Sequence, residues 1–273
     1  MVAMAVEFRS DPAQAPRRGP GWWFSGVSEM ARRNIRHILR SPELVAYALI
    51  QPVMFVLLFT YVFGGAMHVP GGNYKQFLLP GIFVQMVLFG SVFGTTVGVS
   101  TDLRSGIMDR FRSMPISRSA VLVGRTVSEI LRNLVSVAVM IVVGLLIGFR
   151  LDDGLLPALG GLALLLFFGY AMSWLGVYVG MSTGSPNAAQ SAGLTWLFPF
   201  TFLSSAFAPT GSMPGWLQAY ADHSPMTTMV DSVRGLSDGT PVGSEVLQTL
   251  AWSAGVTLLF GTLAVRKYAS QSR

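Results

Sequence analysis

The sequence contains no cysteine and carries few charged residues. Without a thiol, disulfide bonds, thiolate metal sites and cysteine nucleophiles are all excluded. Only 12% of the 273 residues are charged, whereas soluble domains carry roughly 25%. Hydrophobic residues make up 51% of the chain, and the mean hydropathy is +0.53. We therefore expect an all-α integral membrane protein.

Motifs for catalysis and for nucleotide binding are also missing. His37, His68 and His223 form no cluster with metal-ligand spacing, so we expect no metal. Because Lys75 and Lys267 are the only lysines, a phosphate-binding loop of the Gly-x-x-x-x-Gly-Lys type is impossible. We expect no catalytic residue and no cofactor in this chain. Any directed transport must then draw its energy from a partner.

The net charge of +6 points to membrane topology rather than to nucleic-acid binding. Basic residues collect on the cytoplasmic side of membrane proteins. If the N-terminus is cytoplasmic, sixteen Lys and Arg lie inside and only Lys75, Arg150 and Arg234 lie outside. We expect both termini in the cytoplasm and no nucleic-acid partner. We also expect no cleaved signal peptide, since no apolar region follows Arg17 and Arg18.

Six apolar segments have lengths near the roughly 20 residues that a helix needs to cross a bilayer. They are Leu44–Phe63, Phe77–Val99, Ile130–Phe149, Leu155–Met181, Ala188–Ala208 and Val246–Val265. The chain is accordingly divided into a flexible N-terminus (1–21), an interfacial helix (22–41), a six-helix membrane domain (42–268) and a cytoplasmic tail (269–273).

The segment 22–41 separates apolar and basic residues onto opposite helical faces. Its polar face carries Arg32, Arg33, Arg36 and Arg40. Tryptophans at one end and arginines on the polar face are typical of a helix that lies in the membrane interface. A soluble helix packed on a partner is the alternative.

A charged stretch at 101–118 interrupts the apolar segments. One helical stripe holds Leu103, Ile107, Phe111 and Met114, and roughly the opposite stripe holds Asp102, Ser105, Asp109 and Arg112. Thr101 can cap the start of such a helix, and Pro115 stops it. The pattern predicts a short amphipathic helix that offers its polar face to a partner.

Charges also occur in the lower part of the third apolar helix. Arg125, Glu129 and Arg132 follow one another at helical spacing, so they share a face and can pair. We interpret them as an ion pair that holds the base of the helix. A transport role is the alternative.

Glycines recur at spacings of four on the second and fourth spans. They are Gly90, Gly94 and Gly98 on the second span and Gly176 and Gly180 on the fourth. Such ladders permit close contact between helices.

The region 205–240 is too long for a simple turn and too broken by proline to span. Ser224 and Pro225 resemble a cap followed by proline at the first helical position. Met226, Met229 and Val230 then follow at helical spacing. We predict a helical hairpin that dips into the outer leaflet and lines a vestibule. An ordinary external loop is the alternative.

Three of these stretches resemble the type-2 ABC export permeases. Asp102, Arg104, Gly106, Asp109 and Pro115-Ile116-Ser117 are similar to the cytoplasmic coupling helix of that family. RNIRHILRSPELVAYALIQPVMFVLLFTYVFGG resembles its interfacial helix and first span, and FLSSAFAPTGSMPGWLQAYADHSPMTTMVDSVRGL resembles its external hairpin. The daunorubicin-resistance type of drug and lipid exporter is the most similar. The chain departs at Ser105 and Ile107-Met108, where many members have Glu and Thr.

The resemblance implies one half of a transporter in a bacterial cell membrane. A second permease chain, identical or related, and separate ABC ATPase subunits that hold ATP and Mg complete it. The residues implied in contact with the ATPase are Asp102, Arg104, Gly106, Asp109, Arg110, Arg112 and Pro115. An amphipathic drug or lipid is the implied substrate. Its path is expected at the interface between the two permeases, with candidates Tyr47, Gln51, Phe55, Phe59, Gln85, Trp196 and Phe200.

Three other classes of function are weaker readings of the sequence. One is a membrane subunit that does not transport. An ion-coupled carrier is disfavoured because no convincing carboxylate lies in the middle of a span. A membrane enzyme acting on lipid has only Asp222, His223 and Asp231 as candidates, and their spacing fits no catalytic motif.

Overall fold

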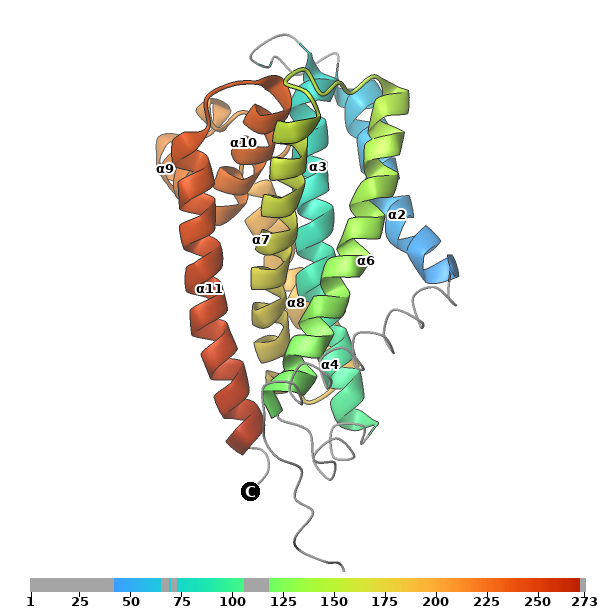
Figure 1. Ribbon diagram of the computed structural model, residues 1–273, viewed down its shortest axis with the longest axis vertical. Helices are drawn as coiled ribbons and strands as arrows, with labels where there is room; N and C mark the ends of the chain where they lie inside the picture. The colour runs from blue at the N-terminus through green and yellow to red at the C-terminus, as the bar shows by residue number, and fades with distance from the viewer. Residues whose placement is uncertain (1–41, 65–68, 70–72, 106–117, 271–273) are drawn as a thin grey trace, which may run out of the picture.

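The computed structural model describes residues 42–64, 69, 73–105 and 118–270, and these contain helices and no strand (Figure 1). The α-helices are α2 (Pro42–Leu57), α3 (Tyr74–Phe89), α4 (Thr95–Arg104), α6 (Arg118–Ile147), α7 (Leu155–Ser182), α8 (Pro186–Phe202), α9 (Gly215–His223), α10 (Pro225–Asp238) and α11 (Gly243–Ser270). Segments η2 (Leu58–Phe63) and η3 (Gly90–Gly94) are π-helical, and η4 (Thr210–Ser212) is a 3₁₀ turn.

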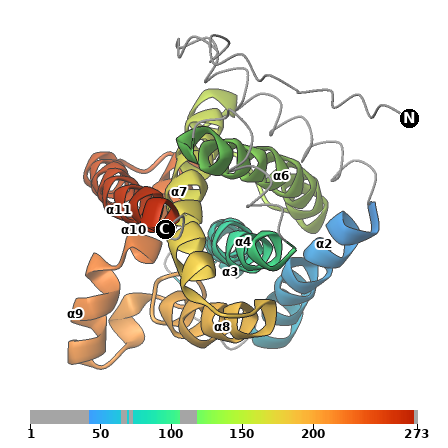
Figure 2. The ribbon, with the colours of Figure 1, turned by 90° about the horizontal axis from the view of Figure 1, so that it is seen from below.

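The continuous helix formed by α3, η3 and α4 is the centre of the bundle. Seen from below, α2, α6, α7 and α8 surround it, and α11 packs on the outer side of α7 (Figure 2). This helix, Tyr74–Arg104, has 31 residues and is the most buried of the candidate membrane spans. Every cavity described below borders it at one end or in its middle.

Four helices of the described chain are long and apolar enough to cross a membrane. They are Tyr74–Arg104, Glu129–Ile147, Leu155–Ser182 and Gly243–Tyr268. The first expected span corresponds to α2 and η2, which run without a break from Pro42 to Phe63 and include the apolar part Ile50–Val62, and the fifth corresponds to α8 with 17 residues. At 1.5 Å per residue, α8 reaches about 26 Å, less than the roughly 30 Å hydrocarbon core. The structure thus describes a multi-pass helical protein, and the count of six spans stays a prediction.

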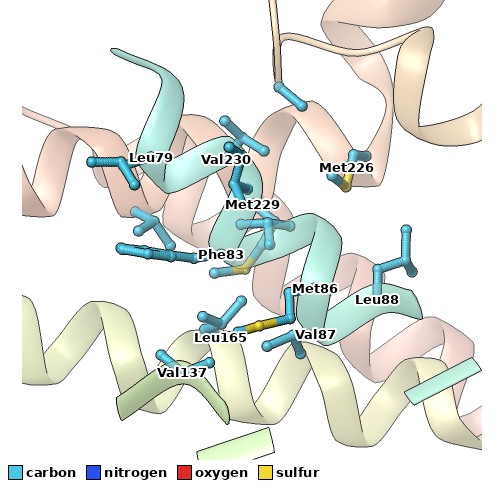
Figure 3. Close-up of a cluster of buried hydrophobic side chains, with 14 of the residues drawn as sticks. Leu79, Phe83, Met86, Val87, Leu88, Val137, Leu165, Met226, Met229 and Val230 are labelled. Carbon is cyan, nitrogen blue, oxygen red and sulfur yellow. The ribbon is translucent and has the colours of Figure 1, made fainter. Parts of the chain in front are cut away.

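The hydrophobic core lies where α3 meets α6, α7 and α10. In Figure 3, Met86 of α3 lies beside Leu165 of α7, and Phe83 lies near Met229 of α10. All four side chains are buried. Lipid tails are as apolar as these side chains, so close packing rather than removal from water favours this arrangement in a membrane.

The glycine ladder of α7 allows a close approach to the second span. A Cβ atom on Gly176 would lie 2.6 Å from the carbonyl oxygen of Val92, and one on Gly180 would lie 2.6 Å from that of Thr96. The hydroxyl of Thr96 donates to the carbonyl of Gly176 at 3.2 Å. These contacts agree with the close helix packing that the spacing predicts.

The end of α4 shows that a helix start at Thr101 was a wrong expectation. Thr101 lies inside α4, and its hydroxyl donates to the carbonyl of Val97 at 2.8 Å instead of capping a new helix. The second span therefore continues to Arg104, five residues past the expected end at Val99. The residues 106–117 lie outside the described part of the chain, so the coupling helix stays a prediction.

The two helices α9 and α10 lie at the end of the bundle opposite the C-terminus (Figure 1). Ser224 caps α10 by accepting a hydrogen bond from the Met226 amide, and Pro225 is its first residue. Met226, Met229 and Val230 are fully buried against the core. The predicted cap and apolar periodicity are confirmed, whereas the depth of this hairpin in a membrane stays a prediction.

Candidate functional site

Arg234 joins three segments at what we call the hairpin end, the end of the bundle that carries α9 and α10. Its guanidinium pairs with Asp231 at 2.5 Å, and it donates to the carbonyl oxygens of Phe77 and Ser205, both at 3.1 Å. It also lies 3.8 Å above the ring of Phe77. Asp231 accepts a further hydrogen bond from the Ser205 hydroxyl at 2.9 Å. The α10 helix is thereby fastened to α3 and to the segment that follows α8.

Gln76 fastens the same end to the connection between α6 and α7. Its Nε2 donates to the carbonyl of Arg150 at 2.6 Å and to Asp238 Oδ1 at 2.9 Å. Its Oε1 accepts from the Arg150 amide at 3.1 Å. Both the oxygen and the nitrogen of this side-chain amide are thus hydrogen-bonded. A cavity of about 700 Å³ lies beside it and is lined by Gln76, Arg234 and Asp238, among others.

Burial shifts the ionisation of the hairpin end. It raises the pKa of Asp231 above its ordinary value, while the Arg234 charge and the Ser205 hydrogen bond oppose the rise. It lowers the pKa of Arg234, and Asp231 opposes that change. Burial also raises the pKa of Asp238, and the hydrogen bond from Gln76 opposes it.

A second cavity, which we call the cleft, opens beside the middle of the second span. Its volume is about 730 Å³. The lining residues come from α2, the second span, α6 and α8, and they are Gln51, Pro52, Gln85, Met86, Phe89, Gly90, Phe93, Gly94, Val97, Gly98, Arg132, Asn133, Ser136 and Leu194. Ligand sites in proteins commonly have this size and this mixture of apolar walls with a few polar groups.

One member of an ion pair, Arg132, lines the cleft. Arg132 pairs with Glu129 at 2.5 Å and also donates to the carbonyl of Gly90. Gly90 comes fifteen residues after Lys75 and fourteen before Arg104 on one continuous helix. The pair therefore lies beside the middle of the second span, and on its own helix it occupies the first turn of the candidate span Glu129–Ile147. Its role in holding the base of that helix stays a prediction. Charged side chains in a membrane helix are costly and are commonly functional.

The missing side chains of Gly90 and Gly94 make room for this guanidinium. A Cβ atom on Gly94 would lie 2.7 Å from an Arg132 Nη atom, and one on Gly90 would lie 3.2 Å from it. The ladder is expected to permit close contact between helices, and at these two glycines the neighbours are side chains of α6. Beside them, Asn133 donates to the Ser91 hydroxyl at 2.7 Å. Neither Asn133 nor Ser91 was singled out from the sequence.

Two polar atoms at the cleft lack a hydrogen-bond partner among the described residues. They are Nε2 of Gln85 and Nε of Arg132. Gln85 is only 3% exposed, so its amide cannot be satisfied by bulk water. An unpartnered buried polar group costs about 1–3 kcal/mol, which a suitable ligand atom would recover.

The structure divides the residues proposed for the substrate path into two groups. Gln51 and Gln85 line the cleft. Phe55 and Phe59 instead contact Phe207, with ring centroids 6.1 Å and 4.8 Å away. On α8, Trp196 packs against Phe200 at 6.0 Å, and both are partly buried against the core. The aromatic candidates with described side chains thus form helix contacts, and among the described candidates only the two glutamines line the cleft.

Several expected site residues lie outside the described part of the chain. They include Gly106, Asp109, Arg110, Arg112 and Pro115 of the charged stretch, Arg32, Arg33, Arg36 and Arg40 of the interfacial segment, and the side chains of Tyr47 and Arg125. Of the expected coupling residues, Asp102 and Arg104 are described. Arg104 donates to the carbonyl of Gly184 at 3.2 Å, joining the ends of α4 and α7.

Comparisons with known proteins extend the resemblance seen in the motifs. A model of the ABC-2 type transporter family matches residues 26–236. The chain is 36% identical to the daunorubicin resistance ABC transporter permease protein DrrB1 of Streptomyces coeruleorubidus, covering 82% of this chain and 78% of that one. It is 26% identical to the probable doxorubicin resistance ABC transporter permease protein DrrC of Mycobacterium tuberculosis, over 78% and 76%. It is 24% identical to the putative transport permease ycf38 of Porphyra purpurea, over 78% and 74%.

Proposed function

Because this chain belongs to the ABC-2 type transporter family, we propose that it is the permease subunit of an exporter driven by a separate ABC ATPase. The substrate is an amphipathic drug or a lipid-like molecule that leaves the cytoplasm or the inner leaflet. ATP and Mg are bound by the ATPase, and a second permease, identical or related, completes the membrane part. The complex lies in a bacterial cell membrane with both termini of this chain in the cytoplasm.

The observation that carries this proposal is the match to the family over most of the chain, from residue 26 to residue 236. Two of the relatives matched over about three quarters or more of both chains are described as permeases of drug-resistance ABC transporters, and a third is described as a putative transport permease. The cleft supports it, because a drug-sized cavity with polar groups beside the middle of a span provides room for cargo between the two membrane faces.

Force from the ATPase would enter through the charged stretch that follows α4. Asp109 and Arg112 are proposed to contact a polar groove on the ATPase. Arg104, at the end of α4, would carry the movement into the second span, since it is joined to α7 through Gly184. The second span then transmits the movement to the cleft, because Gly90 and Gly94 of that helix contact Arg132.

Purification of the full chain from its native host, followed by an ATPase assay, tests this function. We expect a stoichiometric ABC ATPase to co-purify with the chain. Reversing two charges, with Asp109→Arg and Arg112→Glu, should lower substrate-stimulated ATP hydrolysis at least tenfold or release the ATPase. Arg150→Glu, an exposed charge reversal at the hairpin end, is the matched control and should change neither. A chain that purifies without any ATPase at every salt concentration would overturn the proposal.

A further inference from the structure

We propose that the cleft binds a neutral, largely apolar molecule through a carbonyl or hydroxyl oxygen, with Gln85 and Arg132 as the hydrogen-bond donors. This inference rests on the proposed transport function and gives the chemistry of the group that the cleft recognises. The evidence is the combination, in one cavity, of two unpartnered donors and apolar walls, with the charge of its Arg132 paired to Glu129 beside the cavity.

The donors indicate that the ligand supplies an acceptor. Gln85 is buried on α3, and its Nε2 has no partner among the described residues. Arg132 forms an ion pair with Glu129 through Nη2 and donates from the same nitrogen to the carbonyl of Gly90, yet its Nε is likewise without a partner among the described residues. Two amine-type donors at one cavity favour an oxygen acceptor over another donor such as an ammonium group.

The charge balance indicates that the ligand is neutral. Glu129 lies 2.5 Å from Arg132 and offsets its charge, so these two described side chains together carry no net charge. An anion would have to leave water without meeting an unpaired cation among the described lining residues, and burying a charge without a partner is costly. A carbonyl or hydroxyl oxygen has a much smaller desolvation cost and accepts the same hydrogen bonds.

The remaining walls indicate an apolar body. Met86, Phe89, Phe93, Val97 and Leu194 line the cleft. Methionine and phenylalanine offer adaptable contact area to flat apolar molecules. The volume of about 730 Å³ accommodates a molecule of three or four fused rings.

A matched pair of probes tests this recognition directly. 9-Fluorenone and fluorene share one tricyclic body, and only fluorenone carries a carbonyl oxygen. Binding of radiolabelled fluorenone to the purified full chain in detergent is measured with each unlabelled compound as competitor. The ratio of the two inhibitory concentrations is compared between proteins, which cancels the difference in partition into micelles. Wild type should prefer fluorenone, and Gln85→Met should reduce that preference about fivefold, the value of one hydrogen bond.

Gln190→Met is the matched control, because Gln190 is exposed on α8 and does not line the cleft. It should keep the wild-type ratio. Equal ratios in wild type and a folded Gln85→Met protein would overturn the proposal. If Gln85→Met does not fold, the wild-type protein is labelled with the photoreactive ketone benzophenone instead. Labelling within residues 85–97 that fluorenone blocks would support the site. Labelling only at other residues would contradict it.

Two further arms separate the possible outcomes. Dioleoylglycerol is a neutral lipid that carries ester carbonyls and one hydroxyl next to its tails. If it competes better than fluorenone, the natural ligand is a lipid rather than a free small molecule. If the wild-type chain binds an ATPase but shows no preference for fluorenone over fluorene, the site is refuted and the proposed function stays intact. Ketone preference in a chain that never binds an ATPase would support the site and refute the proposed function.

Discussion

The hairpin end and the cleft both hold ionisable side chains, yet their hydrogen bonding differs. At the hairpin end, Arg234 has three oxygen partners and Gln76 uses both ends of its amide. In the cleft, Gln85 and Arg132 each keep a nitrogen without a partner among the described residues. A satisfied buried network stabilises one structure, whereas an unsatisfied one costs free energy until something binds. We therefore assign the hairpin end to holding the fold and the cleft to holding the ligand.

The largest predicted effect on stability comes from removing the contacts of Arg234 at the hairpin end. Arg234→Met leaves Asp231 without its cation and the carbonyl oxygens of Phe77 and Ser205 without this donor. Removing one partner of a buried pair costs about 3–5 kcal/mol, and we expect about 3 because Asp231 keeps 36% exposure. The midpoint of thermal unfolding in detergent should fall by several degrees.

Arg150→Met is the control for this change, because Arg150 is exposed at the same end and contributes its backbone groups to the contacts described above. It should unfold at the wild-type temperature. If both variants unfold together, Arg234 does not hold the hairpin end.

A smaller effect compares two glycines of the bundle. Gly176→Ala places a Cβ atom 2.6 Å from the backbone oxygen of Val92, which cannot move without shifting the second span. Overpacking of this kind costs about 1–3 kcal/mol. Gly94→Ala meets only the end of the Arg132 side chain and should destabilise less. Denaturation of the two variants side by side checks the order, and the reverse order would mean that Arg132 is as rigid as backbone.

The smallest effect is a pH dependence at the hairpin end. Burial raises the pKa of Asp238 above its ordinary 3.8, so the folded state binds its proton more tightly than the unfolded state. The stability this provides is complete below pH 3.8 and is lost as the pH rises through the folded pKa. Asp238→Asn cannot titrate, so its stability relative to wild type should improve across that window. A difference that does not vary with pH would show that Asp238 titrates as in the unfolded chain.

Local signals in the sequence predicted α10 well. Ser224, Pro225 and the spacing of Met226, Met229 and Val230 gave both the cap and the buried face, because capping and periodicity act within a few residues. The same local logic failed at Thr101. A threonine can cap a helix or donate to a carbonyl of the previous turn. Because the second span continues past Thr101, its hydroxyl donates to the carbonyl of Val97.

Sequence reasoning singled out Gln51 and Gln85 of the cleft but not how Arg132 and the glycines meet there. The spacing of Glu129 and Arg132 predicted that they share a face, but the depth of the pair depends on where α6 crosses the second span. Gly90 and Gly94 carried a pattern typical of helix packing, and nothing local shows that an arginine fills it. Asn133 follows Arg132 directly in an apolar helix, a signal that could have marked it.

The most direct test of the division between fold and function is ATP hydrolysis by the permease–ATPase complex with fluorenone or fluorene added. We predict that fluorenone stimulates the wild-type complex more than fluorene does. Gln85→Met should reduce that difference without lowering the unfolding midpoint, because it removes a buried amide that has an unpartnered nitrogen. Arg234→Met should keep the difference at temperatures where the protein is folded. Loss of the difference in Arg234→Met together with its survival in Gln85→Met would contradict the account.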